Sequence, residues 1–201
     1  MARHRSLVAS AGSVVLAFLV YGVVTGADLA IPYAVIVLGG VALVAALEPD
    51  DGFSRLVLVG LCFWAIGHLA GGTIGIGGER TLYNSLLPGN IHFDNVVHFV
   101  GFGTSGLVWW EATRPWLPAH PNHVIGAGVA VWLAGMGVGA LNEMVEYILT
   151  LVLEDTNVGG FHNTGRDLIA NCLGAGVAGV IAVRRLRRTA PATAPGVARS
   201  A

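Results

Sequence analysis

The chain has 201 residues, of which 54% are hydrophobic and only 11% are charged, and its mean hydropathy is +0.70. Because soluble domains carry roughly 25% charged residues, this composition excludes a soluble globular protein and predicts a polytopic membrane protein. The net charge of -1 and the gathering of arginines near the two ends of the chain give no indication of nucleic-acid binding. Cys62 and Cys172 both lie in apolar runs, so we expect buried thiols rather than a disulfide framework.

Six apolar segments follow one another along the chain, each near the roughly 20 residues that a helix needs to cross a bilayer. They are, approximately, residues 7–26, 29–47, 53–76, 91–110, 124–151 and 168–183. Unbroken apolar runs of this length are typical of helices and exclude a closed barrel. The sequence therefore predicts an all-α fold, a single domain of six transmembrane helices over residues 1–188. A low-complexity, disordered tail is expected over residues 189–201.

The distribution of arginine predicts the orientation of the bundle. If both termini are cytoplasmic, nine arginines lie inside and only Arg80 and Arg166 lie outside. We therefore expect a multi-pass protein of the cell membrane, with longer outer loops over residues 77–90 and 154–166. Arg3 and Arg5 before the first segment are also compatible with a signal peptide, but the apolar core is longer than the roughly 7–15 residues of such a peptide.

Polar residues inside the apolar segments are the main functional signal. The fifth segment contains Asn142, Glu143 and Glu146, which share one face of a helix. The fourth segment places Asp94 one helical turn before His98. A charged side chain at bilayer depth costs about 2.5–3.5 kcal/mol on insertion scales, so these residues are expected to face the bundle interior and to mark a function.

The third and sixth segments add polar residues at the same predicted depth. Asp167 precedes the sixth segment, Asn171 lies one turn deeper, and His68 lies in the outer half of the third. We therefore expect one pocket in the outer half of the bilayer, open toward the second of the long outer loops. Arg166 is a candidate ligand for an anion there. Thr164 and Asp167 have a spacing close to a capping box, which gives Asp167 the alternative role of starting the last helix.

The charges of these residues indicate what the pocket needs. Asp94, Glu143, Glu146 and Asp167 would share a small apolar volume with at most one arginine and one or two histidines. Desolvation and mutual repulsion prevent four unpaired carboxylates from all carrying a charge, so the pocket is expected to hold a cation or shared protons. Carboxylates with one imidazole suit zinc, manganese or iron better than magnesium or calcium. A divalent metal is therefore the candidate cofactor, with these four acids and His98 as candidate ligands.

Three classes of function fit this pattern. The first is an enzyme that acts on a membrane lipid or lipid-linked phosphate of the cell envelope through a metal or acid–base site. The second is a proton- or ion-coupled carrier or flippase, although the inner halves of the segments offer few polar residues for a second gate. The third is a non-catalytic protein whose polar cluster fixes helix packing or docks a partner. The sequence leaves the oligomeric state open. In the enzyme the catalytic candidates are Asp94, His98, Glu143, Glu146 and Asp167, and the substrate-binding candidates are Asn142, Arg166, Asn171 and His68.

Three motifs resemble the VanZ-like membrane proteins and their YjdF-type relatives. They are Asp94-Asn-Val-Val-His98-Phe99, Asn142-Glu143 with Glu146, and Arg166-Asp167-Leu-Ile-Ala-Asn171-Cys-Leu-Gly174. Those families show an Asp-x-x-x-His-Phe start to one span, an acidic pair in the next and an Asp-x-x-x-Asn-x-x-Gly start to the last. The resemblance covers roughly residues 91–183, and Glu146, where VanZ proteins commonly have Gln, favours the YjdF branch. VanZ proteins are associated with low-level glycopeptide resistance, so the resemblance implies a role at the cell envelope without naming a reaction.

Overall fold

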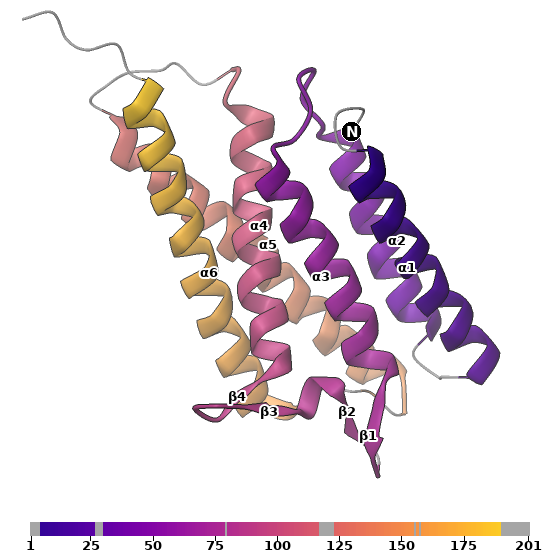
Figure 1. The fold of residues 1–201 in the computed structure, drawn as a ribbon. Helices are drawn as coiled ribbons and strands as arrows, with labels where there is room; N and C mark the ends of the chain where they lie inside the picture. Colours follow the sequence, from indigo (N-terminus) through magenta and orange to yellow (C-terminus); the bar gives the residue numbers. More distant parts are fainter. Residues whose placement is uncertain are drawn as a thin grey trace, which may run out of the picture.

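The structure is a computed structural model that describes residues 5–26, 30–78, 80–116, 123–154, 156 and 158–189. The predicted disordered tail, apart from Thr189, lies outside these residues. Within these residues, six α-helices confirm the predicted all-α membrane fold and its helix count (Figure 1). Their bounds are α1 (Arg5–Thr25), α2 (Ala30–Ala46), α3 (Arg55–Thr73), α4 (Phe93–Thr113), α5 (Val124–Val152) and α6 (Gly160–Thr189).

Helix α4 is the centre of the bundle. It packs against α3, α5 and α6, while α1 and α2 lie on the far side of α3 (Figure 1). Among the described residues α1, α3, α5 and α6 are long and apolar enough to cross a membrane, and α2 is a shorter apolar helix. Helix α4 is less apolar than these helices because it carries several polar residues that face the bundle interior. Its neighbours α3, α5 and α6 surround it. Its apolar part, with Leu107, Val108 and Trp110, packs against Val131 and Ala178.

Glycines allow α4, α5 and α6 to approach closely. A Cβ on Gly103 would lie 2.8 Å from the carbonyl oxygen of Gly174, and a Cβ on Gly106 would lie 2.9 Å from that of Val131. Any larger side chain at these positions would push the helices apart. Such small residues are the usual means by which membrane helices pack backbone against backbone. The close packing brings polar side chains of three helices within hydrogen-bonding reach of one another.

The connection between α3 and α4 is an ordered cap, where the sequence predicted only a loop. Its elements are β1 (Gly75–Gly77), β2 (Arg80–Thr81), the 3-10 helix η2 (Leu82–Asn84), β3 (Leu86–Leu87) and β4 (Ile91–His92). The strands form two antiparallel pairs, β1 with β2 and β3 with β4. Tyr83 anchors the cap, because its buried ring occupies the space that a Cβ on Gly71 would take. We call this end of the bundle the loop end and the opposite end, with the arginines of α6, the terminal end.

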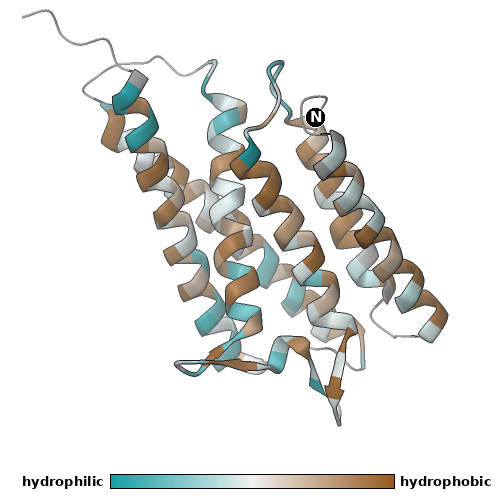
Figure 2. Ribbon diagram, in the orientation of Figure 1, coloured by the Kyte–Doolittle hydropathy of each residue, from teal (hydrophilic) through white to brown (hydrophobic). Residues whose placement is uncertain are grey.

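Helix α6 begins earlier than the sequence predicted. It starts at Gly160 rather than near residue 168, so Asp167 lies about two turns inside the helix and the alternative that it caps the helix is wrong. The segment from Gly160 to Arg166 is polar, and hydropathy therefore excluded it from the predicted span. It is helical nonetheless, since Asn163 turns toward the bundle interior and hydrogen-bonds Asp167 one turn later. Hydrophilic residues thus extend from the loop end into the helices (Figure 2).

Candidate functional site

Helix α4 contributes Asp94 and His98, which lie one turn apart at the loop end. Asp94 is in the first turn, where the helix dipole favours an acidic side chain. His98 is buried, and its Nε2 lies 3.5 Å from Asp94 Oδ1. The imidazole thus forms the centre of the site, with one carboxylate already beside it.

Helix α5 places two more carboxylates around the same imidazole. Glu143 Oε1 lies 3.4 Å from His98 Nδ1, and Glu146 Oε1 lies 3.8 Å from His98 Nε2. Asn142 donates a hydrogen bond of 2.6 Å to Glu146 Oε1 and so orients that side chain. Both carboxylate oxygens of Glu143 are buried without a hydrogen-bond partner among the described residues. Glu143 is therefore the least satisfied acid of the site.

Helix α6 supplies Asp167 and Asn171, whose side chains are both fully buried. Asn171 Oδ1 lies 3.1 Å from His98 Nδ1. Asp167 accepts hydrogen bonds from Asn95 Nδ2 at 2.8 Å and from Asn163 Nδ2 at 2.5 Å. The Nδ2 of Asn163 also lies 3.3 Å from Asp94 Oδ2, so one amide joins the two aspartates. Asn163 and Asp167 are spaced i, i+4 on one helix face.

Sequence reasoning missed Asn95 and Asn163 as members of the site. Asn95 follows Asp94 directly and also accepts a hydrogen bond from the backbone N–H of His92, which fixes the start of α4. Asn163 was placed in a loop because the polar start of α6 was not predicted as helix. The i, i+4 spacing of Asn163 and Asp167 is the signal that could have found it.

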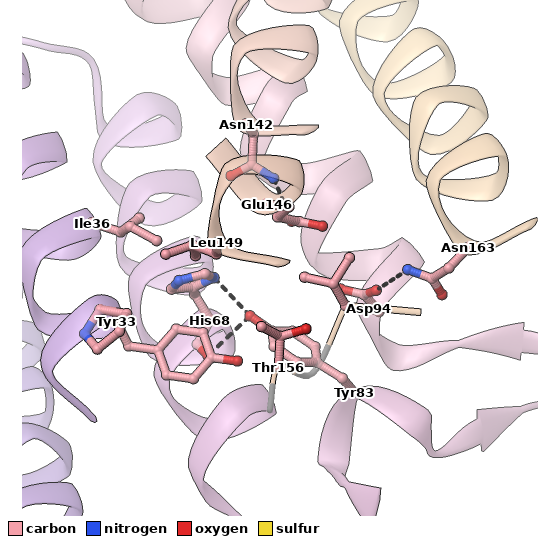
Figure 3. A pocket seen from close by; sticks show the side chains of 12 residues that line it. Tyr33, Ile36, His68, Tyr83, Asp94, Asn142, Glu146, Leu149, Thr156 and Asn163 are labelled. Carbon is pink, nitrogen blue, oxygen red and sulfur yellow. Dashed lines mark hydrogen bonds between the residues drawn. The ribbon is translucent and has the colours of Figure 1, made fainter. Parts of the chain in front are cut away.

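His68 of α3 is held from the cap rather than from the acids. The hydroxyl of Tyr83 lies 2.6 Å from His68 Nδ1 and 3.0 Å from the His68 carbonyl oxygen (Figure 3). Trp64 stacks on the imidazole, with ring centroids 5.5 Å apart. Burial raises the pKa of Tyr83 well above its usual value, with smaller contributions from Tyr33 and nearby acids. The Tyr83 hydroxyl therefore stays protonated and remains a donor to His68.

A small cavity of about 50 Å³ opens beside the acids. A buried water needs a cavity volume of roughly 10–15 Å³. This cavity therefore admits a few waters or a small hydrated ion but not a whole lipid headgroup. Figure 3 shows side chains from several helices directed toward this space. Its lining residues are Pro32, Tyr33, Ile36, His68, Tyr83, Asp94, Asn142, Glu146, Leu149, Thr156, Val158 and Asn163. Thr156 and Val158 belong to the connection before α6, the side toward which the sequence predicts the opening.

Two groups of side chains have the spacing of metal ligands. One is Asp94, His98 and Asp167, and the other is His98, Glu143 and Glu146; in each, the candidate ligand atoms lie within 4.8 Å of one another. The groups share His98, whose two ring nitrogens face carboxylates on opposite sides. One nitrogen can therefore ligate a metal while the other donates its proton to a carboxylate, an arrangement that orients metal-bound histidines.

The structure brings most of the predicted site residues together and leaves one aside. The four acids, His98, Asn142 and Asn171 meet between α4, α5 and α6, within about 16 Å of the helix ends at the loop end. Of these, Asp94, Asn142 and Glu146 line the cavity, as does His68. Arg166 is exposed and does not line this cavity. No arginine is among the lining residues in the described part of the chain, and the sequence contains no lysine. The site is thus strongly acidic.

A second acid of α4, Glu111, lies near the terminal end, outside the group of four site acids, and was not singled out from the sequence. It is 2% exposed and accepts hydrogen bonds of 2.7 Å from Arg185 and from the backbone N–H of Ser54. Arg185 also lies over the ring of Trp110. Glu111 therefore joins the start of α3 and the end of α6 to α4, and its charge is paired.

No curated protein and no solved structure matches the chain. A family model described as "Predicted membrane protein (DUF2238)" matches residues 6–188. This match covers the six helices, apart from the first residue of α1 and the last of α6, and every residue of the acidic site. The chain belongs to this family of membrane proteins.

Proposed function

We propose that this membrane protein binds a divalent metal ion among Asp94, His98, Glu143, Glu146 and Asp167 and acts on a lipid or lipid-linked phosphate of the cell envelope. The observation that carries the proposal is the state of Glu143, whose buried oxygens accept no hydrogen bond of good geometry among the described residues, the amide of Asn171 being only a weak partner, and face His98 at 3.4 Å. An ionised carboxylate that is buried without donors is strongly unfavourable unless a cation compensates it. A metal ion bound between the acids and His98 supplies that cation.

The metal also explains how an acidic pocket can accept a phosphate. The described lining residues include no arginine, and the surrounding carboxylates repel an anion. These carboxylates and His98 would hold a divalent ion, which would supply an attraction for a phosphate oxygen, polarisation of the phosphorus–oxygen bonds and a lowered pKa of a bound water. In the proposed hydrolysis a site carboxylate would take a proton from the attacking water, the new P–O bond would form as the ester P–O bond breaks, and the carboxyl group would then give this proton to the leaving oxygen.

A lipid substrate fits the surroundings of the acids. Pro32, Ile36, Leu149 and Val158 give the cavity an apolar wall beside Asp94 and Glu146. The cavity volume of about 50 Å³ is too small for a headgroup, so the phosphate alone would enter while the lipid chains stay in the bilayer. Asn142, Asn171 and His68 are the proposed substrate-binding side chains, and Arg166 is a weaker candidate because it is exposed. In the orientation that the arginines favour, with both termini cytoplasmic, the site serves the outer leaflet of the cell membrane.

The motif resemblance supports the same setting. The order of the three motifs along α4, α5 and α6 is that of the VanZ-like and YjdF-type proteins, and we propose that the chain is nearest to the YjdF branch. Among the residues that carry this resemblance, Asp94, Glu143, Glu146 and Asp167 surround the imidazole of His98 in space.

Phosphate release from lipid phosphates tests the proposed reaction. Purified full-length protein in liposomes would be incubated with phosphatidic acid or a polyprenyl diphosphate, with zinc, manganese or iron present or removed by chelator. We expect metal-dependent phosphate release that falls at least about 100-fold in Glu143→Gln. The control is Glu154→Gln, which alters an exposed acid outside the site. Release that persists in Glu143→Gln, or no release with either substrate and any of the three metals, overturns the proposed reaction.

A proton-coupled carrier is the second candidate, because His98 has a carboxylate beside each ring nitrogen. An imidazolium in this position can pass protons to either side, as intramembrane relays do. The route toward the terminal end is less suitable, since the apolar residues Leu107 and Val108 lie before Glu111, which is paired with Arg185. Solute flux into proteoliposomes that follows a pH gradient and is lost in Glu146→Gln would favour the carrier over the enzyme.

A further inference from the structure

A second surface feature lies near the terminal end, away from the acids. It is a groove of about 310 Å³ between α5 and α6. Ligand sites in proteins commonly measure about 300–1,000 Å³, so the groove has the size of a binding site. Its lining residues are Ile125, Gly128, Val129, Trp132, Gly176, Gly179, Val180, Val183, Arg184 and Arg187. We call it the α5–α6 groove.

The length of the groove matches one leaflet of a bilayer. Its residues on α6 run from Gly176 to Arg187, which at about 1.5 Å per residue is about 16 Å along the helix. The hydrocarbon core of a bilayer is about 30 Å thick, so this is about half of it. The indole of Trp132 closes the deep end, where Nε1 donates a hydrogen bond of 3.1 Å to the carbonyl oxygen of Cys172.

Glycines form the floor of the groove. A Cβ on Gly128 would lie 3.1 Å from the carbonyl oxygen of Gly179, so these residues bring the two helices into contact. Gly176 is different, because a Cβ there would meet nothing within 4 Å. The absence of side chains leaves a smooth apolar channel, with Val129 and Val180 along its sides. Such a channel can take an extended hydrocarbon chain from the surrounding bilayer.

Two arginines lie at the mouth of the groove. Arg184 and Arg187 are three residues apart and therefore share a helix face, and both are exposed. The neighbouring Arg185 forms an ion pair with Glu111, whereas no ion pair among the described residues includes Arg184 or Arg187. Guanidinium groups bind phosphate oxygens in pairs of hydrogen bonds, and basic pockets between membrane helices bind anionic headgroups.

We propose that the α5–α6 groove binds one anionic phospholipid, with an acyl chain along the glycine floor and the headgroup phosphate between Arg184 and Arg187. The two positive charges select against zwitterionic lipids, whose headgroups carry a cation next to the phosphate. The lipid covers apolar surface of Val129, Trp132 and Val180, each of which is at least 39% exposed in the chain alone. The site is separate from the acids and does not depend on the proposed metal.

Lipid titration of the purified full-length protein in detergent tests the headgroup site. Native mass spectrometry would compare phosphatidylglycerol with phosphatidylcholine of the same chains, and we expect tighter binding of the anionic lipid. Arg184→Gln combined with Arg187→Gln should weaken phosphatidylglycerol binding about 30-fold, since each basic residue contributes about a fivefold factor. Arg188→Gln is the control, because it removes a charge from the same turn outside the groove. Equal binding of both lipids, or an equal loss in Arg188→Gln, overturns the proposal.

A variant with a larger side chain in the groove tests the proposed binding site of the acyl chain. Gly176→Leu places a side chain in the groove at a position where a Cβ meets nothing within 4 Å, and should abolish phosphatidylglycerol binding while the melting temperature is retained. Gly137→Leu is the control, because Gly137 is exposed in equally open space on α5 but outside the groove. Binding that survives Gly176→Leu contradicts the proposal. Light scattering that shows a dimer in the wild type and a monomer in Gly176→Leu would assign the groove to a second copy of the chain and overturn the proposal that it binds a lipid.

Discussion

Glu143 and His98 face each other between α5 and α4, with Glu143 Oε1 3.4 Å from His98 Nδ1 and no hydrogen bond of good geometry to either Glu143 oxygen among the described residues. The helices can come this close because Gly135 allows it; a Cβ there would lie 2.6 Å from the carbonyl oxygen of Phe102. A buried acid held against an imidazole by close backbone packing is costly unless a cation or a proton compensates it. The predictions on the site follow from this relationship.

The melting temperature in detergent separates a functional site from a packing role. We expect Glu143→Gln to retain or raise the melting temperature of the metal-free protein, because it removes an acid that is costly to bury while keeping the shape of the side chain. The same variant should lose most of the stabilisation that added metal gives the wild type. If Glu143→Gln instead melts well below the wild type without metal, the cluster serves helix packing, as the third class of function predicts.

A glycine on α5 controls the position of Asn171. A Cβ on Gly139 would lie 2.7 Å from Asn171 Nδ2, so Gly139→Ala displaces the side chain whose Oδ1 lies near His98 Nδ1. We expect metal affinity to fall about 10–100-fold, the usual effect of disturbing a residue that orients a ligand. Isothermal titration would measure this against Gly137→Ala, where the new methyl group meets open space. Equal affinities of the two variants would contradict a positioning role for Asn171.

The cap depends on the contact between Tyr83 and His68. Tyr83→Phe removes the hydroxyl that lies 2.6 Å from His68 Nδ1 and leaves a buried ring nitrogen without this partner. We expect a loss of about 1–3 kcal/mol in unfolding free energy. Tyr147→Phe, which changes an exposed tyrosine of α5, should cost much less. Denaturant titration of both variants measures the difference, and similar small losses would show that the hydrogen bond contributes little.

The ion pair at the terminal end should stabilise the bundle. Glu111→Gln removes the negative charge of the ion pair with Arg185 and weakens the contact to the backbone of Ser54, for an expected loss of about 2–4 kcal/mol. The exposed pair of Asp51 and Arg114 offers a comparison, since Asp51→Asn should cost no more than about 1 kcal/mol. A loss in Glu111→Gln no larger than in Asp51→Asn would contradict this role of Glu111.

The sequence alone predicted the helices and the helix faces that form the site. Apolar length determined six spans, and the i, i+4 spacing of Asp94 and His98 placed both side chains on one face. The sequence pattern could not show that the polar segment from Gly160 to Arg166 is helical. A polar segment has the hydropathy of a loop, and the sequence does not reveal which buried residues it contacts. The amide of Asn163 is satisfied by acids on two helices, which is a tertiary effect.

The sequence alone could not predict the structural role of Glu111 either. It stands among aromatic and small residues near the end of a span, where an exposed acid at the membrane surface is the ordinary expectation. Its burial results from Arg185, 74 residues later in the chain, and from the start of α3. The cap was missed for a similar reason, since strands of two or three residues have no recognisable periodicity.

Metal content tests the central claim most directly. The full-length protein, purified in detergent without chelator and exchanged against zinc, manganese or iron, would be subjected to elemental analysis together with His98→Ala, Glu143→Ala and the control Glu154→Gln. The account predicts near-stoichiometric metal in the wild type and in Glu154→Gln, with less than about a tenth of that amount in the other two variants. A wild-type protein that keeps its fold and its melting temperature but takes up none of the three metals would contradict it.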